Sequence, residues 1–366
     1  MKRFWVWMGT RPEAIKLCPL ILELRRRGAR VRIMLTGQHR DMVSPVLSFF
    51  GISADEDLSV MRDSQSVQHL TERLLIAMGE VLARTPRPDA VLVHGDTSTA
   101  LCGAMSAFYA GIPIYHVEAG LRSDDIHAPF PEEFNRRAID AMSDIHFAPT
   151  DAAARRLRQE GYSERGIFVV GNTATDALRL CLEQPLSHPL LEETKERLIL
   201  LTSHRREWGE GERVELLRGI RDAIEHRTGV RVIFPVHPSP VVQRAAWQAF
   251  GGCENVIMTD PLPLPLMQHL LARAWLLLTD SGGLQEEASY LGVPTLVLRT
   301  TTERPEGVAA GVLRVVGGGR ETVRQALELF LRCPAEREAM AHPSMVFGDG
   351  HAARYITDVL MREDEA

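Results

Sequence analysis

The sequence predicts an α/β protein of two domains, each built on a doubly wound parallel sheet. Three observations support this fold. The chain has 366 residues, which is enough for two hydrophobic cores at about 150 residues per domain. Short apolar runs alternate with longer segments of helical spacing from end to end. The runs are nearly continuous in apolar residues, as expected of parallel strands that helices cover on both faces.

Apolar runs predict the strands of both domains. Those of the first domain are expected at 4–8, 31–35, 90–93, 112–115, 145–148 and 167–170. Those of the second are expected at 198–201, 232–234, 256–258, 275–278, 295–298 and 313–316. The polar, Pro-containing stretch 184–195 interrupts the alternation and is the best linker candidate. The last helical segment, 350–361, has no strand to follow it.

Charge and cysteine content narrow the class of protein. The 42 Lys and Arg residues against 48 Asp and Glu residues give a net charge of −6, so nucleic acid and anionic membranes exert no general attraction. The five cysteines are scattered singly, which argues against a disulfide framework and fits a reducing cytoplasm. The longest uncharged segment, 97–117, contains Ser, Thr, Gly and Pro, and predicts a buried helix and a strand. We expect a cytoplasmic protein without a membrane span.

Polar clusters follow the predicted strands at seven points. The first half of the chain contains GTRPE, HGDT and HVEAGLRSDD, and the second contains TSHRRE, PVHPSP, TDSGGLQEE and RTTTERPE. Because parallel strands end at one edge of a sheet, these clusters are expected to line a shared cleft. Ordinary polar loops would explain any single cluster. Seven clusters rich in His, Arg and carboxylate favour a functional site.

The turn 280–283 has the outline of a phosphate site. Ser281 is expected to cap the next helix, and the two glycines let a ligand approach the exposed amides. Glu287, one turn into the helix, can accept from ribose hydroxyls, although a solvated helix face is the alternative for Glu286 and Glu287. Neighbouring strand ends supply the cations that a diphosphate needs, namely His204, Arg205, Arg206, Arg299 and Arg304.

The turn 9–13 leads from the first strand into a helix. Pro12 fits the first helical position, and Glu13 complements the helix dipole. Arg11 has no such structural role and is therefore a candidate binding residue. The turn lacks G-x-G-x-x-G, so the sequence predicts no dinucleotide cofactor.

Three carboxylates are candidates for acid/base chemistry. Asp96 and Glu118 follow adjacent strands, and Glu132 begins a helix. Carboxylates gathered in one cleft move one another's pKa values apart, which supplies one acid and one base. Helix capping is the alternative for Asp96 and Glu132.

A transition-metal site is a rival interpretation of the same region. His94, Asp96, His116 and Glu118 place two imidazoles and two carboxylates at adjoining strand ends. His94 and Asp96 would share a side only if the strand continued through both, and no dense motif such as H-E-x-x-H is present. Hydrogen-bonded histidines are the favoured interpretation, so neither a metal nor a cofactor is predicted.

The motifs along nearly the whole chain are GTRPEAIK, VHGDT, HVEAGLR, PFPEE, NRR, GNT, HRRE, DSGGLQEE, TTERPEG and FGDG. Together they resemble those of the non-hydrolysing UDP-N-acetylglucosamine 2-epimerases of bacteria. The resemblance implies the GT-B architecture, in which two Rossmann-like domains flank an active-site cleft and a C-terminal helix crosses back. It places the first domain at 1–170 with the helix at about 352–366, and the UDP-binding domain at 171–351.

Family motifs also imply a role for individual residues. The catalytic residues implied are Asp96, Glu118, Glu132 and His204. The substrate-binding residues implied are Arg11, Lys16, Arg205, Ser281, Gly282, Gly283, Glu287 and Arg304.

The family's reaction explains why such residues are needed. The C2 proton has no neighbouring carbonyl to acidify it, so UDP leaves C1 first and 2-acetamidoglucal forms as C2 loses its proton. UDP then adds back after a proton reaches the opposite face of C2. The implied partners are UDP-N-acetylglucosamine, UDP-N-acetylmannosamine and UDP, in a homodimer that serves cell-surface polysaccharide biosynthesis.

Four alternatives of related chemistry stay open. The hydrolysing UDP-N-acetylglucosamine 2-epimerases differ in their acidic loops, and GT-B glycosyltransferases need an acceptor. UDP-2,3-diacetamido-glucuronate 2-epimerases typically have Asn where Leu121 stands. A regulator that only binds a nucleotide sugar would not need three carboxylates.

Many bacterial members of this family are activated by UDP-N-acetylglucosamine at a second site. The matching residues present in this chain are Gln38, Gln65, Arg205 and His237. Asp41 stands where Gln is common, and Ser64 where Arg is common. The loss of a phosphate donor and the added negative charge predict weak or absent activation, unless Arg62 or Arg40 substitutes.

Overall fold

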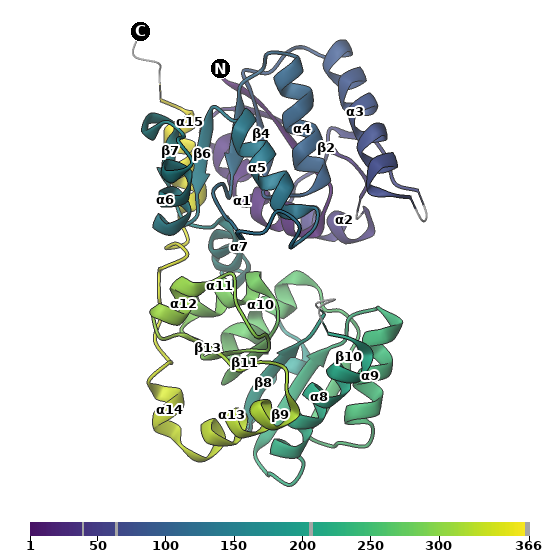
Figure 1. Cartoon of the computed structure of the whole chain (residues 1–366), viewed down its shortest axis with the longest axis vertical. Coiled ribbons are helices and arrows are strands. Elements are labelled where there is room, and N and C mark those ends of the chain that lie inside the picture. Colours follow the sequence, from purple (N-terminus) through teal and green to yellow (C-terminus); the bar gives the residue numbers. More distant parts are fainter. Residues whose placement is uncertain (39, 63–64, 205–207, 363–366) are drawn as a thin grey trace. The chain divides into compact units, whose positions relative to one another are not determined.

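A computed structural model describes residues 1–38, 40–62, 65–204 and 208–362. The chain forms two compact units (Figure 1): an N-terminal unit of residues 1–177 and 348–366, and a C-terminal unit of residues 178–347. The family resemblance predicted domain boundaries between residues 170 and 171 and between residues 351 and 352. The first crossing between units falls inside helix α7 (Thr173–Leu182). The stretch 184–195 lies within the C-terminal unit, where Leu191 is buried in a hydrophobic core.

The N-terminal unit contains a seven-stranded sheet in the order β3-β2-β1-β4-β5-β6-β7, and every adjacent pair is parallel. Its strands are β1 (Arg3–Met8), β2 (Arg30–Leu35), β3 (Glu56–Asp57), β4 (Ala90–His94), β5 (Ile114–Val117), β6 (Ile145–Ala148) and β7 (Ile167–Val169). The two-residue β3 was not predicted, because it is too short for an apolar run. The strand expected at 112–115 lies at Ile114–Val117 instead, so His116 is part of the sheet.

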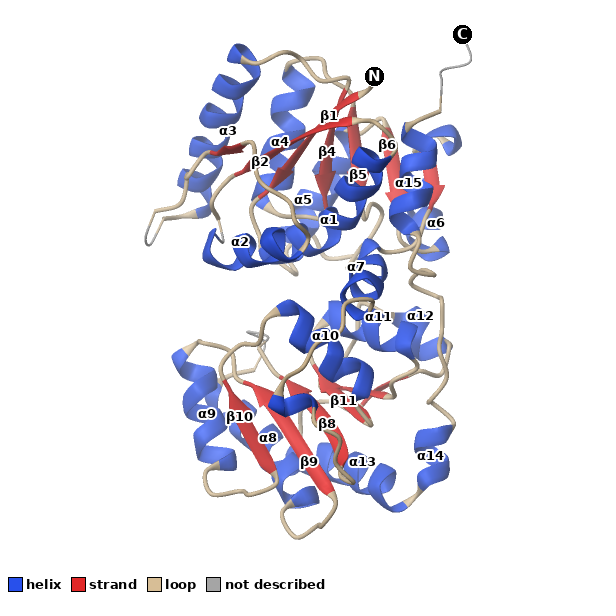
Figure 2. Cartoon of the chain, turned by 180° about the vertical axis from the view of Figure 1, so that it is seen from behind, coloured by secondary structure: helices blue, strands red, loops and turns tan. Residues whose placement is uncertain are grey.

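Helices cover both faces of this sheet. Helices α3 and α5 flank α4 on one face, and α2 and α15 flank α1 on the other (Figure 2). The helices of the unit are α1 (Arg11–Arg26), α2 (Arg40–Phe49), α3 (Val67–Arg84), α4 (Ser98–Tyr109), α5 (Glu132–Met142), α6 (Asp151–Gln159), the first part of α7, and α15 (Ala352–Leu360). Helix α4 and strand β5 confirm the buried helix and strand expected within 97–117.

The C-terminal unit repeats this plan with six parallel strands in the order β10-β9-β8-β11-β12-β13. The strands are β8 (Arg197–Thr202), β9 (Val230–Pro235), β10 (Val256–Thr259), β11 (Leu276–Thr279), β12 (Thr295–Val297) and β13 (Leu313–Val315). The helices are α8 (Glu210–Ile224), α9 (Pro240–Phe250), α10 (Leu264–Arg273), α11 (Gly282–Leu291), α12 (Pro305–Ala309), α13 (Arg320–Arg332) and α14 (Pro334–Glu338).

Neighbouring residues of β8 show why the strands are apolar throughout. Ile199 and Leu201 belong to the core formed with α8, α9 and α13, whereas Leu200 belongs to a second core formed with α10. Side chains alternate between the faces of a strand, and both faces are covered, so each position needs an apolar residue. The prediction of two doubly wound parallel sheets is confirmed.

Strand order determines where each unit can bind a ligand. In both sheets the chain runs outward from a central strand, then crosses to its other side and runs outward again. The reversal lies between β1 and β4 in the N-terminal unit and between β8 and β11 in the C-terminal unit. Ligands of open α/β sheets bind at the carboxyl ends of the strands beside this reversal.

The C-terminal segment returns to the N-terminal unit. Both carboxylate oxygens of the buried Asp176 accept hydrogen bonds from the N-terminus of α15, from the amides of Ala352 and Ala353 at 3.0 and 2.9 Å. At the other end of the helix, Lys2 donates to the carbonyl of Leu360 at 2.9 Å. Helix α15 also packs against α1, so the final helix is part of the N-terminal unit.

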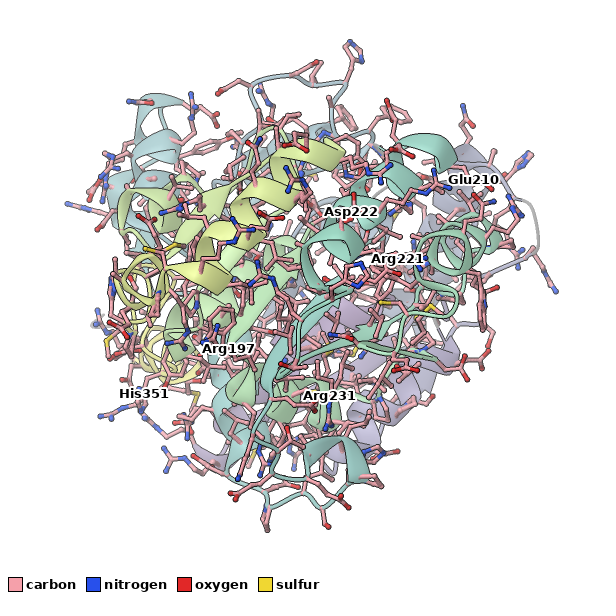
Figure 3. All side chains as sticks on the ribbon, turned by 90° about the horizontal axis from the view of Figure 1, so that it is seen from below. Arg197, Glu210, Arg221, Asp222, Arg231 and His351 are labelled. Carbon is pink, nitrogen blue, oxygen red and sulfur yellow. The ribbon has the colours of Figure 1, made fainter. Side chains whose placement is uncertain are left out.

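Charged side chains on the C-terminal unit pair across its surface. Arg231 and Asp222, both labelled in Figure 3, form ion pairs with Glu196 and Arg320. These pairs are partly exposed to solvent, which screens their attraction. They therefore indicate a solvated surface. Nowhere in the described part of the chain does a helix combine the length and apolar character needed to span a bilayer.

Candidate active site

Glu118 lies directly after β5, at the carboxyl end of the N-terminal sheet. Its backbone has φ of 69°, in the left-handed region that non-glycine residues rarely occupy. Its amide donates to the carbonyl of Phe147 at 3.0 Å, which fixes this turn to the next strand. Oε1 of its carboxylate accepts from Nζ of Lys16 and from Nδ2 of Asn172, the latter at 2.6 Å. Donors with positive charge favour the ionised carboxylate.

The second carboxylate oxygen of Glu118 faces His94. Nε2 of His94 lies 3.5 Å from Oε2, and the His94 side chain is almost fully buried. Burial lowers the pKa of His94 to about 3, against the opposing charge of Glu118. His94 is therefore neutral at physiological pH, and Lys16 supplies the positive charge beside Glu118.

Asp96 follows β4 and is held by α5. Its Oδ2 accepts from Nε of Arg136 at 2.8 Å, and Nη2 of Arg136 lies 2.7 Å from the same oxygen. Its backbone carbonyl accepts from Nδ2 of Asn135 at 2.7 Å. Thr97 caps the following helix, so the capping alternative for Asp96 is wrong. Asp96 lies two residues beyond His94 and is one quarter exposed.

Glu132 is the first residue of α5, and Pro131 occupies the N-cap position, so Glu132 does not cap the helix either. Glu132 and Arg136 are four residues apart and share one face of α5. Because Arg136 binds Asp96, that face is turned toward Asp96. Oε2 of Glu132 is buried and has no hydrogen-bond partner among the described residues. The adjacent Glu133 is fully buried and stabilises the fold, because its carboxylate accepts a hydrogen bond from the amide of Ser123 at 3.0 Å.

A buried network lies beneath these carboxylates. His116 has its Nδ1 2.6 Å from Oδ1 of Asp140 and its Nε2 2.8 Å from the carbonyl of Gly95. Arg122 donates to the other oxygen of Asp140 at 2.7 Å. Both ring nitrogens of His116 are thus bound within the protein, and neither is available to a metal ion. This geometry overturns the metal interpretation of His94, Asp96, His116 and Glu118.

Burial opposes ionisation of Asp140, but His116 and Arg122 outweigh it and hold the pKa of this carboxyl below its usual value. The network reaches the candidate site through Gly95, whose carbonyl His116 binds. Gly95 separates His94 from Asp96 and has φ of 66°. A side chain added at Gly95 would lie 3.4 Å from Oε2 of Glu118. The network thus fixes the loop that carries Asp96.

The N-terminus of α1 brings Arg11 and Lys16 to the same edge. Thr10 caps the helix and forms a capping box with Glu13, so Pro12 is the second helical residue and not the first. Glu13 is buried and also accepts from Oγ1 of Thr97 at 2.6 Å. Burial raises the pKa of Glu13, and these hydrogen bonds act against the rise. Arg11 is the first residue of the helix and is half-buried.

In the C-terminal unit, His204 follows β8 at the strand reversal. Its amide donates to Oδ2 of the buried Asp280 at 2.8 Å, and its Nδ1 lies 3.1 Å from Oδ1 of the same carboxylate. The His204 ring stacks on that of His237, which follows β9, with centroids 6.2 Å apart. His204 is two-fifths exposed, so its ring is open to a ligand. Beneath it, Arg213 is buried and donates to Oγ of Ser203 at 2.7 Å.

The turn 280–283 leads from β11 into α11. Ser281 stands at the N-cap position, but its side chain makes no capping hydrogen bond, and its amide donates to Oγ1 of Thr279 at 2.9 Å. Gly282 is buried, whereas a Cβ added at Gly283 would meet no atom within 4 Å. The first turn of α11 therefore opens onto free space, where a helix N-terminus favours an anion.

Glu286 and Glu287 are both buried, so the solvated-face alternative is wrong. Arg304 forms an ion pair with Glu286 through its Nε. Thr302 donates to Oε1 of Gln285 at 2.7 Å, which ties the same loop to α11. Through these contacts the loop that carries Arg304 lies against α11, the helix that carries Glu287. Burial of the charged Glu286 requires a cationic partner, and the spacing of residues within α11 does not identify Arg304 as that partner.

The structure describes only some of the residues predicted for the second site and for the phosphate site. Gln38 accepts from Oγ1 of Thr99 at 3.2 Å, whereas Gln65 donates to the sulfur of Met61 at 2.9 Å. His237 contacts His204, as described above. Arg205, Arg206 and Ser64 lie outside the described residues, and so does the side chain of Arg40.

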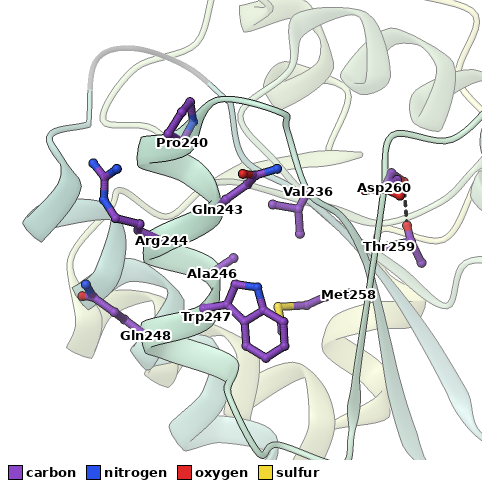
Figure 4. Close-up of a pocket in the computed structure, with 10 residues that line it drawn as sticks. All are labelled: Val236, Pro240, Gln243, Arg244, Ala246, Trp247, Gln248, Met258, Thr259 and Asp260. Carbon is purple, nitrogen blue, oxygen red and sulfur yellow. Dashed lines mark hydrogen bonds between the residues drawn. The ribbon is translucent and has the colours of Figure 1, made fainter.

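A separate groove of about 700 Å³ runs between α9 and β10 (Figure 4). Trp247 and Met258 form its apolar wall, and Gln243 and Thr259 add polar groups. None of the predicted site residues that the structure describes is among those lining it. The groove is lined in part by Val236 and Pro240 of the strand-end cluster PVHPSP.

Sequence reasoning assigned no role to several residues that hold the site. Asn135 and Arg136 lie in the motif NRR, and Asn172 lies in GNT. Asn172 follows the run 167–170, so the rule that polar residues after strands form the site would have found it. No comparable signal identifies Arg213, which is buried within an ordinary amphipathic helix.

Comparison with known proteins places the chain in a family. Residues 22–361 match the family model described as UDP-N-acetylglucosamine 2-epimerase. The UDP-N-acetylglucosamine 2-epimerase of Bacillus subtilis (strain 168) is 44% identical over 356 residues, covering 96% of this chain and 93% of that protein. The chain belongs to the UDP-N-acetylglucosamine 2-epimerase family. The predicted family, of the isomerase class, is confirmed.

Solved structures of the family agree with the fold. The UDP-GlcNAc 2-epimerase from Neisseria meningitidis, bound to UDP-GlcNAc, has a TM-score of 0.92 at 36% identity and covers 99% of this chain and 100% of its own. S. aureus MnaA with UDP also has a TM-score of 0.92, at 37% identity, and covers 98% of this chain and 96% of its own. The predicted GT-B architecture is therefore confirmed.

Asp140→Asn should destabilise the protein in a pH-dependent way. Removing one member of a buried ion pair costs about 3 kcal/mol at pH 7. The pKa of Asp140 is lowered in the folded state, so its stabilising effect is present above the unfolded pKa and is lost as pH falls. The difference in thermal unfolding midpoint between wild type and variant should therefore narrow as the pH falls below about 4.

Asp358→Asn is the matched control, because its pair with Arg27 is two-fifths exposed. Its effect should stay below about 1 kcal/mol at every pH. If the difference in unfolding midpoint between wild type and Asp140→Asn does not change with pH, Asp140 is not ionised in the buried network.

Proposed function

We propose that this protein interconverts UDP-N-acetylglucosamine and UDP-N-acetylmannosamine at C2 of the sugar. The observation that carries the proposal is the Glu118 carboxylate, which Lys16 and Asn172 bind at the edge of the sheet where Asp96 also lies. Acid/base groups gathered at a strand reversal are what proton transfer at carbon requires. The relatives that bind UDP-GlcNAc and UDP support this substrate.

The reaction proceeds by elimination and re-addition of UDP. The C1–O bond breaks and UDP keeps its electron pair, while the C2 proton passes to a base and a C1=C2 double bond forms. UDP then attacks C1 as a proton is delivered to the opposite face of C2. The first step develops positive charge at C1 and negative charge on UDP, so it needs a carboxylate near the sugar and cations near the diphosphate.

The N-terminal unit supplies the acid/base groups. Glu118 is ionised beside Lys16 and is therefore suited to accept the C2 proton. Asp96 is also paired with a cation, Arg136, and stabilises positive charge at C1. Glu132 has a buried carboxyl oxygen without a partner among the described residues and lies on the face of α5 that is turned toward Asp96, so we assign it the role of the acid.

The C-terminal unit holds UDP. Its phosphate seat is the open first turn of α11 at Ser281–Gly283, with the side chains of Arg304 and His204 nearby. Asp280 orients the ring of His204, which donates a hydrogen bond to departing UDP. Glu287 binds the ribose hydroxyls, and Arg11 binds substrate from the N-terminal unit. Arg205 is proposed as a further binding residue on the resemblance alone.

A homodimer is proposed on the resemblance and on one observation. Ile76 of α3 and Phe108 and Tyr109 of α4 are more than half exposed on neighbouring helices. Large apolar side chains that are exposed together indicate an interface. The occupant we propose is a second copy of the chain.

The proposal is tested by incubating the protein with UDP-N-acetylglucosamine in deuterated water and recording proton NMR spectra. A mixture containing UDP-N-acetylmannosamine should form, with deuterium at C2 of both nucleotide sugars. Free N-acetylmannosamine as the main product would show a hydrolysing enzyme, and sugar transfer to an added acceptor would show a glycosyltransferase. Binding without turnover would indicate a regulator or an enzyme for UDP-2,3-diacetamido-glucuronate.

The same assay distinguishes chemical roles from binding roles. Asp96→Asn, Glu118→Gln and Glu132→Gln should each lower kcat by about 10²-fold or more, as expected for positioned acid/base groups. Ser281→Ala and Glu287→Ala should act mainly on KM, because they hold parts of the substrate that do not react. Near-normal kcat in all three carboxylate variants would refute these roles.

We infer that activation by UDP-N-acetylglucosamine is weak or absent. Asp41 is exposed at the start of α2, where it opposes an anionic effector. The reverse reaction should therefore start without a lag from UDP-N-acetylmannosamine alone, and trace UDP-N-acetylglucosamine should leave its rate unchanged. A long lag that the trace nucleotide sugar abolishes would show a working effector site.

A further inference from the structure

We propose that Asn172 is a positioning residue that fixes the reactive orientation of the Glu118 carboxylate. This inference rests on the role proposed for Glu118. Asn172 lies between β7 and α7, and its side-chain amide has two partners that determine its orientation. Oδ1 accepts from the amide of Ala174 at 3.0 Å, and Nδ2 donates to Oε1 of Glu118 at 2.6 Å. The first contact leaves Nδ2 as the group that faces Glu118.

The Asn172 side chain is held in place from several directions. Asn172 is 2% exposed, and its carbonyl accepts from the amide and the hydroxyl of Thr175 at 3.1 and 2.7 Å. Gly348, with φ of 121°, covers its backbone so closely that an added Cβ would lie 3.0 Å from the Asn172 nitrogen. A buried amide with fixed partners has few alternative positions, so it constrains the group it binds.

Two donors on one oxygen determine how the carboxylate lies. Lys16 and Asn172 both bind Oε1, which directs Oε2 toward His94. His94 is neutral and does not compete with Lys16 for the charge. Lys16 supplies the positive charge that keeps Glu118 ionised, and Asn172 fixes the orientation of the Glu118 carboxylate. Losing Asn172 should therefore reduce the rate of proton transfer without weakening the binding of UDP.

Asn172 also caps α7 through Ala174, so a structural role has to be separated from a positioning role. Asn172→Asp and Asn172→Ser both keep an oxygen that can cap the helix. Both lose the Nδ2 donor to Glu118, because an ionised Asp has no proton to donate and the Ser side chain ends one atom short of Nδ2. Asn172→Asp also places a second negative charge beside the carboxylate. The two variants should fold with nearly wild-type unfolding midpoints.

In the epimerisation assay, both variants should lower kcat by about 10- to 100-fold with KM nearly unchanged, as expected when a reacting group loses its orientation. The acidic limb of the kcat profile should move to higher pH in Asn172→Asp, because a neighbouring carboxylate makes Glu118 harder to ionise. If Asn172 only caps α7, Asn172→Ser will retain the wild-type kcat and pH profile, and the inference is overturned.

Glu118→Gln separates this inference from the function on which it rests. Combining Glu118→Gln with Asn172→Ser should lower kcat no further than Glu118→Gln alone, because the two residues act as a unit. If the fold decreases in kcat of the two single variants multiply in the double variant, Asn172 acts independently of Glu118. Full activity in Glu118→Gln would instead refute the role of Glu118, whatever the Asn172 variants do.

Discussion

The site of the N-terminal unit depends on one interaction, the binding of the Glu118 carboxylate by donors from separate segments. Lys16 comes from α1 and Asn172 follows β7, while His94, which ends β4, lies 3.5 Å from the other carboxylate oxygen. They reach one carboxylate because all these strands are parallel and end at the same edge of the sheet. The left-handed backbone of Glu118 is retained because its amide is bound by the adjoining strand end.

Electrostatics divides the acidic residues of this edge into two groups. Asp140 and Glu133 are buried with cationic partners and stabilise the loops that carry the site. Glu118 and Asp96 also have cationic partners but are less deeply buried, so substrate can reach them. The C-terminal unit follows the same division, since Glu286 is paired within the fold while His204 is open to solvent.

Much of the fold and of the candidate site could be predicted because parallel strands covered on both faces must be apolar, and polar residues then stand out where the strands end. The prediction failed where this signal is absent. Strand β3 has two residues, and the burial of Glu286 depends on Arg304, 18 positions away along the chain. Asn172 follows the rule but was not assigned a role, since a single amide carries no chemistry until its neighbour is known.

The family of the chain and the roles of its residues rest on different observations. The motifs identified the family, which the comparisons confirm, whereas the roles of individual residues stay predictions. The metal interpretation was open from sequence alone, and only the two acceptors around His116 excluded it. Capping was likewise a reasonable alternative for Asp96 until Thr97 was found in that position.

The central claim is that Glu118 is an ionised carboxylate in the resting protein. Infrared difference spectroscopy between wild type and Glu118→Gln in deuterated water near neutral pH tests it most directly. The account predicts that the substitution removes a carboxylate stretching band and leaves the carboxylic-acid C=O region unchanged. Loss of a carboxylic-acid C=O band would show that Glu118 is protonated, and would contradict its role as the base.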